Sequence, residues 1–136
     1  MDKYFAMFVG FVASIVSYAV DGLGLAVTVL IGMMAIDYVT GLLSAAINHS
    51  LNSRIGFFGV ARKIYYLLLV GSVYLISLVI PGIEYAGDGV AVALAVLELI
   101  SITENGVALG LPIPQYVQNL LLIVKNKSET PGGDGK

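Results

Sequence analysis

The chain has 136 residues, of which 58% are hydrophobic and only 12% are charged, and its mean hydropathy is +0.93. This exceeds what the core of a soluble domain of this size needs, so the composition indicates an all-α membrane protein of about four short spans, with no separate catalytic domain in these residues. The formal net charge of −2 argues against nucleic acid as a partner, and a chain without Cys has no disulfides or thiol chemistry. We expect no enzyme activity, no metal and no cofactor.

The first apolar segment, residues 4–20, lies between Lys3 and Asp21. Its length is at the lower limit for a helix that spans a membrane. Residues 17–19 resemble a signal-peptide cleavage site. The next apolar segment, 22–47, starts at once, however, and this favours a retained helix. We therefore predict a tight turn at Asp21 and Gly22, and an antiparallel hairpin of the first two helices.

A basic stretch without acids, residues 48–63, separates the second segment from the third, which runs over 64–80 and ends at Pro81. We predict that the stretch is a loop, with Gly56 and Gly59 allowing a compact turn and Phe57 and Phe58 lying at the headgroup boundary. The bases of this loop are Arg54, Arg62 and Lys63.

The fourth segment, residues 89–111, is apolar but contains Glu98 and Glu104. After Pro112 and Pro114, residues 115–125 have a narrow polar face, which predicts a short interfacial helix. The last residues, 128–136, are rich in Gly and charge and are predicted to be disordered. Residues 1–127 would form a single transmembrane domain.

The distribution of bases predicts the orientation of the chain. Lys3, the basic stretch and the tail lysines share one side of the membrane if there are four spans, whereas Asp21, Glu84 and Asp88 fall on the other. Because cytoplasmic loops carry an excess of Lys and Arg, both termini are predicted to be cytoplasmic. The alternative has three spans, with the fourth segment lying partly in the interface.

Polar residues recur at helical spacing within the apolar segments, and they are the candidates for function because charges in a bilayer are costly. The alternatives are purely structural roles. Small residues allow helices to pack closely, and Asp37 could form an ion pair with Arg62 or Lys63. No catalytic or phosphate-binding constellation is recognisable. The candidates for a polar stripe lining a pore are Asp37, Thr40, Ser44, Glu98, Ser101, Glu104 and Asn105. The candidates for helix packing are Gly10, Ser14, Ser17, Gly41 and Gly106.

Four motifs occur in a specific order: DYVTG at 37–41, LNSRIGFFG at 51–59 with Arg62 and Lys63 after it, ELISITEN at 98–105 and GLPIP at 110–114. Together they resemble the phage lysis and toxin-secretion holin family of Gram-positive phages and prophages. The resemblance covers about residues 37–125. The first helix matches only in character, and the tail after Lys125 is shorter and less charged than is typical of the family.

The resemblance implies a multi-pass protein of the bacterial cytoplasmic membrane that associates with copies of itself and opens a pore or lesion. An endolysin or a toxin would cross there, leading to host lysis, and an antiholin is a further partner. We hypothesise that ionisation of Asp37 or Glu98 accompanies opening, because burial favours the neutral form; unchanged lysis timing in Asp37→Asn and Glu98→Gln variants would contradict this. The alternative functions are a small ion-channel or transporter subunit that uses Asp37 and Glu98, and an antiholin.

Overall fold

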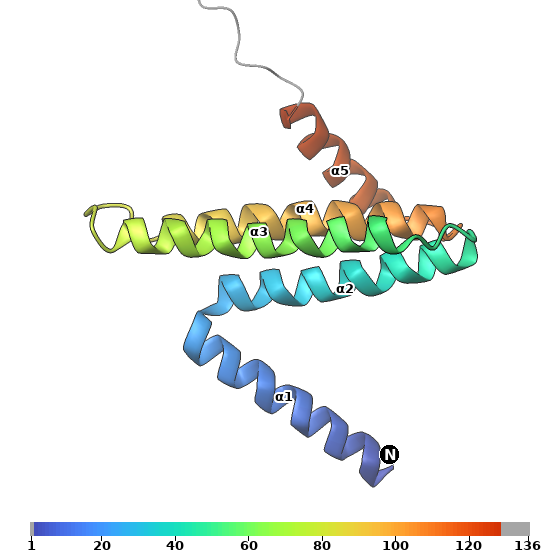
Figure 1. The fold of residues 1–136 in the computed structure, drawn as a ribbon, viewed down its shortest axis with the longest axis horizontal. Helices are drawn as coiled ribbons and strands as arrows, with labels where there is room; N and C mark the ends of the chain where they lie inside the picture. Colours follow the sequence, from blue (N-terminus) through green and yellow to red (C-terminus); the bar gives the residue numbers. More distant parts are fainter. Residues whose placement is uncertain (1, 129–136) are drawn as a thin grey trace, which may run out of the picture.

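A computed structural model describes residues 2–128, apart from some side chains in α1, α3 and α5. This part of the chain is helical and contains no strand, which confirms the predicted all-α class (Figure 1). The helices are α1 (Lys3–Leu23), α2 (Leu25–Ile47), α3 (Ser53–Ser77), α4 (Ala86–Ala108) and α5 (Gln115–Ser128).

Helices α2, α3 and α4 form a three-helix core in which each helix is antiparallel to the next along the chain (Figure 1). Helix α4 packs against both α2 and α3. Small residues on α4 let the neighbouring backbones approach closely, as is usual for membrane helices. The buried apolar side chains are Leu30, Met34, Val70, Ala91, Leu94 and Ala95.

Most large apolar side chains point away from this core; Tyr18 and Leu78, for example, are 83% and 82% exposed. In water such a surface would be unfavourable, whereas in a bilayer it faces lipid. Within the described residues, α2, residues 56–77 of α3, and α4 are long and apolar enough to cross a membrane. In α1 the fully described apolar stretch, Lys3–Ile15, is shorter, although the helix continues to Leu23. Whether α1 adds a fourth span stays a prediction.

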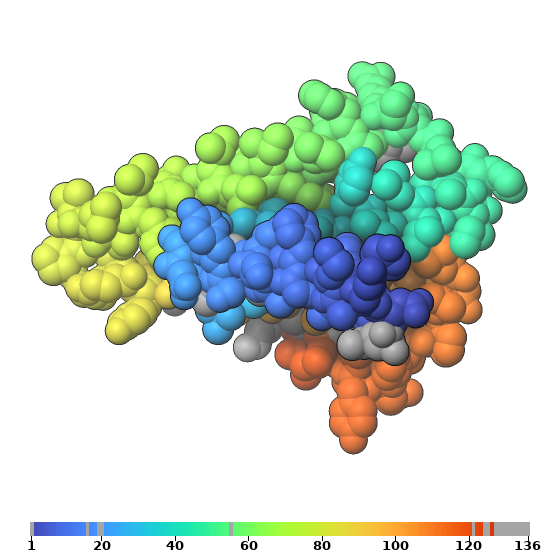
Figure 2. Space-filling view, turned by 90° about the horizontal axis from the view of Figure 1, so that it is seen from below, coloured from blue at the N-terminus to red at the C-terminus, as the bar shows by residue number. Residues whose placement is uncertain are grey.

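Helices α1 and α2 are separated by one residue, Gly24, whose φ of +81° is a conformation that favours glycine. The break therefore lies slightly after the predicted turn at Asp21 and Gly22. The two helices reverse direction as expected but diverge as a V rather than lying side by side (Figure 1). In the view from below, α1 forms a separate ridge in front of the core (Figure 2).

The prediction that residues 48–63 form a loop was wrong. Only 48–52 connect α2 to α3, because the Asn52 side chain caps α3 by accepting a hydrogen bond from the Arg54 N–H at 2.9 Å. Gly56 and Gly59 are helical and make no turn. This stretch contains no Pro, and Arg and Lys have high helix propensity. The basic residues therefore belong to the polar first turns of α3 and not to a loop.

The other boundaries shift by a few residues. Helix α4 begins and ends about one turn earlier than the predicted 89–111, and the chain turns after it at Gly110, which has a φ of +74°. Helix α5 starts at the predicted Gln115 but continues to Ser128, and it points away from the core (Figure 1). The remainder of the predicted disordered tail, 129–136, lies outside the described residues.

Candidate functional site

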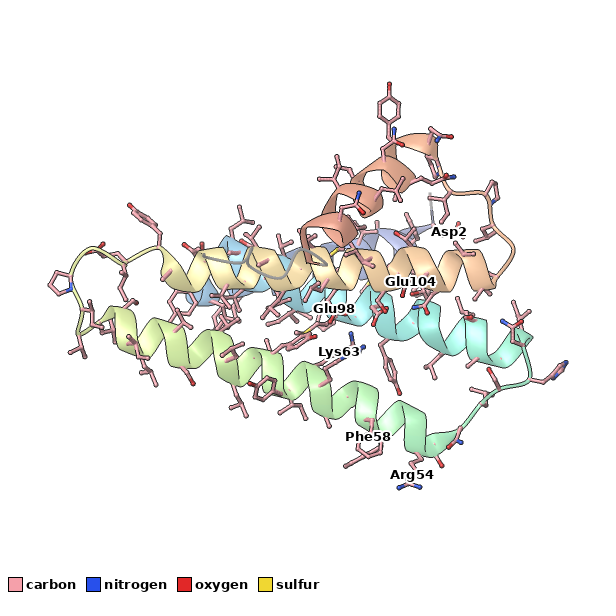
Figure 3. All side chains as sticks on the ribbon, turned by 90° about the horizontal axis from the view of Figure 1, so that it is seen from above. Asp2, Arg54, Phe58, Lys63, Glu98 and Glu104 are labelled. Atoms are coloured by element: carbon pink, nitrogen blue, oxygen red, sulfur yellow. The ribbon has the colours of Figure 1, made fainter. Side chains whose placement is uncertain are left out.

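One lysine joins the three helices of the core. The Lys63 ammonium of α3 donates to Asp37 Oδ2 of α2 at 2.8 Å, and it also forms an ion pair with Glu98 Oε2 of α4. Figure 3 shows Lys63 pointing from α3 towards Glu98, whereas Arg54 and Phe58 point away from the bundle. The side chains of Lys63, Asp37 and Glu98, here called the triad, are only 12%, 8% and 3% exposed. Buried charges of this kind require such pairing.

A second set of polar groups surrounds Asp37. The Asn105 amide of α4 donates to Asp37 Oδ1 at 3.0 Å and to Thr40 Oγ1 at 3.1 Å. Both carboxylate oxygens of Asp37 therefore have donors, and Asn105 of α4 bonds to two residues that lie one turn apart on α2.

A cleft of about 280 Å³ leads to the triad. Its walls come from α2 and α3, it reaches the 48–52 connection, and Ser101 and Asn105 of α4 contribute to its lining. Asp37 and Lys63 line the cleft as well, whereas Glu98 does not. The other polar and glycine residues of the lining are Gly41, Ser50, Asn52, Gly56, Gly59 and Arg62.

Polar contacts also join the helices at both ends of the core. Near the cleft, the Asn48 side chain donates to the Ala108 carbonyl at 3.1 Å. At the opposite end the Tyr74 hydroxyl of α3 hydrogen-bonds to Asp88 of α4. The Tyr74 ring lies over Gly87, where an added Cβ would be 2.7 Å from the ring carbons. Only glycine fits beneath this ring without a shift.

The predicted stripe residues of α2 and α4, apart from Glu104, are buried or half-buried in the core. Asp37, Ser44 and Glu98 are buried, Thr40, Ser101 and Asn105 are half-buried, and Glu104 is exposed. In this arrangement Asp37, Thr40, Glu98 and Asn105 bond to side chains of other helices. Their role in lining a pore stays a prediction.

The predicted packing residues fall into two groups. A Cβ at Gly41 would lie 3.5 Å from the Asn105 amide, so this glycine does lie at the α2–α4 contact, and Gly106 is half-buried. Gly10, Ser14 and Ser17 are exposed on α1. The Ser14 hydroxyl bonds within its own helix, to the Gly10 carbonyl at 2.8 Å.

Sequence reasoning placed Lys63 in a surface loop, although its pairing with Asp37 was one of the alternatives considered. The Tyr74–Asp88 contact was not predicted. A signal for it existed, because the two residues are equally distant from Pro81 and so face each other across a helical hairpin. In the part of the chain that the structure describes, no cluster of three or more His, Asp or Glu side chains is placed to hold a metal ion.

Helices that expose apolar side chains around a buried ionic cluster define an all-helical, multi-pass membrane protein. Residues 14–126 match the bacteriophage holin family, and the chain belongs to that family. This confirms the resemblance seen in the motifs.

The chain is also similar to several curated bacterial proteins. An uncharacterized protein of Listeria monocytogenes is 38% identical over 85% of this chain and 82% of its own length. An uncharacterized protein of Halalkalibacterium halodurans is 30% identical over 83% of this chain and 87% of its own length. An uncharacterized protein of Clostridium perfringens is 31% identical over 75% of this chain and 76% of its own length. No solved structure gives a significant match.

Proposed function

We propose that the protein is a holin. It accumulates in the cytoplasmic membrane of a bacterial host, associates with copies of itself and opens a lesion through which an endolysin, or a toxin in some hosts, crosses. It acts without enzymatic activity. The observation that carries this proposal is the match to the holin family over residues 14–126, which includes all three helices of the core.

The arrangement of polar and apolar surfaces supports the proposal. Asp37 and Thr40 of α2 bond to Asn105 of α4 inside the core, and most large apolar side chains are exposed on the outer surface, so a single copy is suited to storage in lipid. The small face of α1, with Gly10, Ser14 and Ser17, is exposed. Such small-residue faces allow close approach of another membrane helix, and they offer a surface for a second copy.

Induced expression beside a cytoplasmic endolysin tests this function. We expect a delay followed by abrupt lysis, because copies must first accumulate before they enclose a lesion. The control expresses the endolysin alone. Selective ion conductance without endolysin release would instead support a channel subunit, and delayed lysis by a known holin would support an antiholin. A failure to release endolysin at high membrane levels contradicts the proposal.

We further propose four spans, with both termini and the basic start of α3 in the cytoplasm and the 78–85 turn outside. Arg54 and Arg62 are exposed on the first turns of α3, as expected for residues that contact headgroups and cytoplasm. At the opposite end, the Gly82 N–H donates to Glu84 Oε1 at 2.9 Å. This hydrogen bond lowers the pKa of the Glu84 carboxyl, which keeps it ionised and favours contact with water.

Cysteine labelling tests this topology in a chain that has no Cys of its own. With a membrane-impermeant thiol reagent, we expect Glu84→Cys to react in intact cells and Ser128→Cys to react only after the membrane is opened. Labelling of both positions from outside would show three spans, and would overturn the four-span topology without bearing on lesion formation.

A further inference from the structure

The charges of the triad do not balance. Asp37 and Glu98 together with Lys63 carry a net charge of −1 if all three side chains are ionised. A net charge buried between membrane helices is unfavourable, because neither lipid nor the apolar core solvates it. The triad therefore needs one more positive charge.

The other titratable groups nearby do not supply it. On α2, Tyr38 lines the cleft beside Asp37 but carries no positive charge, and on α3 the neighbouring Arg62 is exposed on the cleft wall. Tyr66 of α3 packs against the apolar core, and Glu104 of α4 is exposed and adds no positive charge. A proton on one carboxyl group of the triad would balance the charge with no other partner.

The hydrogen bonds indicate which carboxyl group holds the proton. Asp37 accepts from Lys63 at one oxygen and from Asn105 at the other, so it is arranged as a carboxylate. Glu98 contacts Lys63 through Oε2, and a neutral carboxyl group can still accept that hydrogen bond.

We propose that the Asp37–Lys63–Glu98 triad is a proton-binding site, in which Glu98 carries one exchangeable proton that makes the buried cluster electrically neutral. Binding takes a proton from water and converts the Glu98 carboxylate to a carboxylic acid, and release returns it to water. The proton reaches Glu98 from the cleft, because Lys63 lines the cleft and contacts Glu98. The proposal concerns charge balance in the closed core and does not depend on lesion formation.

Infrared spectroscopy of the full chain in liposomes at neutral pH tests the proton directly. We expect a protonated-carboxyl band that shifts when the chain carries carbon-13-labelled Glu and does not shift with labelled Asp. Because labelling leaves the sequence unchanged, this result does not depend on whether any variant folds. A missing band, or one that shifts with labelled Asp alone, overturns the proposal.

Variants then test the charge balance, with circular dichroism to verify that each remains helical. Glu98→Gln should remove the band. Asp37→Asn should remove it too, because Lys63 alone then balances an ionised Glu98, and Lys63→Met should about double the band because two carboxylates need protons. The control Glu84→Gln changes an exposed carboxylate outside the core and should keep the band. A band that persists in Glu98→Gln, or that Asp37→Asn leaves unchanged, contradicts the charge balance.

The route through the cleft has its own test. Gly59 lines the cleft and has open space at its Cβ position, so Gly59→Leu should fill part of the cleft and slow deuterium exchange of the band several-fold. Gly71→Leu is the matched control, since Gly71 is an exposed glycine of α3 away from the cleft. Equal exchange rates in the two variants would overturn this route.

Discussion

Replacing Lys63 with methionine is expected to lower the free energy of unfolding by about 3–5 kcal/mol at neutral pH, because removing one partner of a buried ion pair leaves the other uncompensated. Here the change removes the one positive charge that contacts both acidic side chains, Asp37 and Glu98, which are 8% and 3% exposed. Methionine keeps the length and the apolar stem of the lysine. Denaturant unfolding in detergent micelles, followed by the loss of helical circular dichroism, measures the change.

The loss should be smaller at mildly acidic pH, because taking up the proton that replaces the Lys63 charge then costs less free energy. Arg54→Met is the matched control: Arg54 is an exposed base on the same helix, and its side chain points away from the bundle (Figure 3). We expect that variant to lose less than about 1 kcal/mol, as is usual for exposed charges. Equal losses in the two variants would show that the triad does not hold the core together.

The second large effect is expected at Gly87, where alanine should lower the free energy of unfolding by about 1–3 kcal/mol, the usual cost of overpacking. The added Cβ would lie 2.7 Å from three ring carbons of Tyr74, so α3 and α4 must separate or the ring must rotate. Either change also weakens the hydrogen bond from the Tyr74 hydroxyl to Asp88. Thermal unfolding of the reconstituted protein measures the loss.

Gly89→Ala provides the control on the same helix, because a Cβ at Gly89 has no neighbour within 4 Å. Alanine there should be neutral or stabilising by up to about 1 kcal/mol from helix propensity. In the double variant Gly87→Ala with Tyr74→Leu, the smaller side chain should relieve part of the clash and reveal a favourable coupling between the two positions. Independent, additive effects would argue against the contact.

The class of the fold and much of the helical framework could be predicted from the sequence, because apolar segments of membrane length admit few other structures. The start of α3 could not, since the bases of residues 54–63 resemble a loop when the sequence is read for charge. What decides this boundary is local: Asn52 caps the helix and no proline follows before Pro81. Helix propensity in that stretch outweighs the polar composition.

The candidate site, too, could be predicted from the sequence only in part. Helical spacing placed Asp37 and Thr40 on one face of α2, and Ser101 and Asn105 on one face of α4, and the structure brings these faces together. Periodicity does not say what a face contacts, however. The position of Lys63 depends on how α3 is rotated about its axis when it packs against α4. A single sequence does not reveal this rotation. The same holds for the ring of Tyr74 over Gly87.

The polar contacts between the core helices occur at three levels: Tyr74 with Asp88 at one end, the triad in the middle, and Asn48 with the Ala108 carbonyl at the other end. Apolar packing discriminates poorly between helix pairings in a bilayer, since lipid tails are as apolar as the side chains they replace. These few polar atoms therefore fix the register of the helices. Sliding or rotating any one helix by a single turn would break contacts at more than one level, so the core should change between discrete arrangements and not drift through intermediate ones.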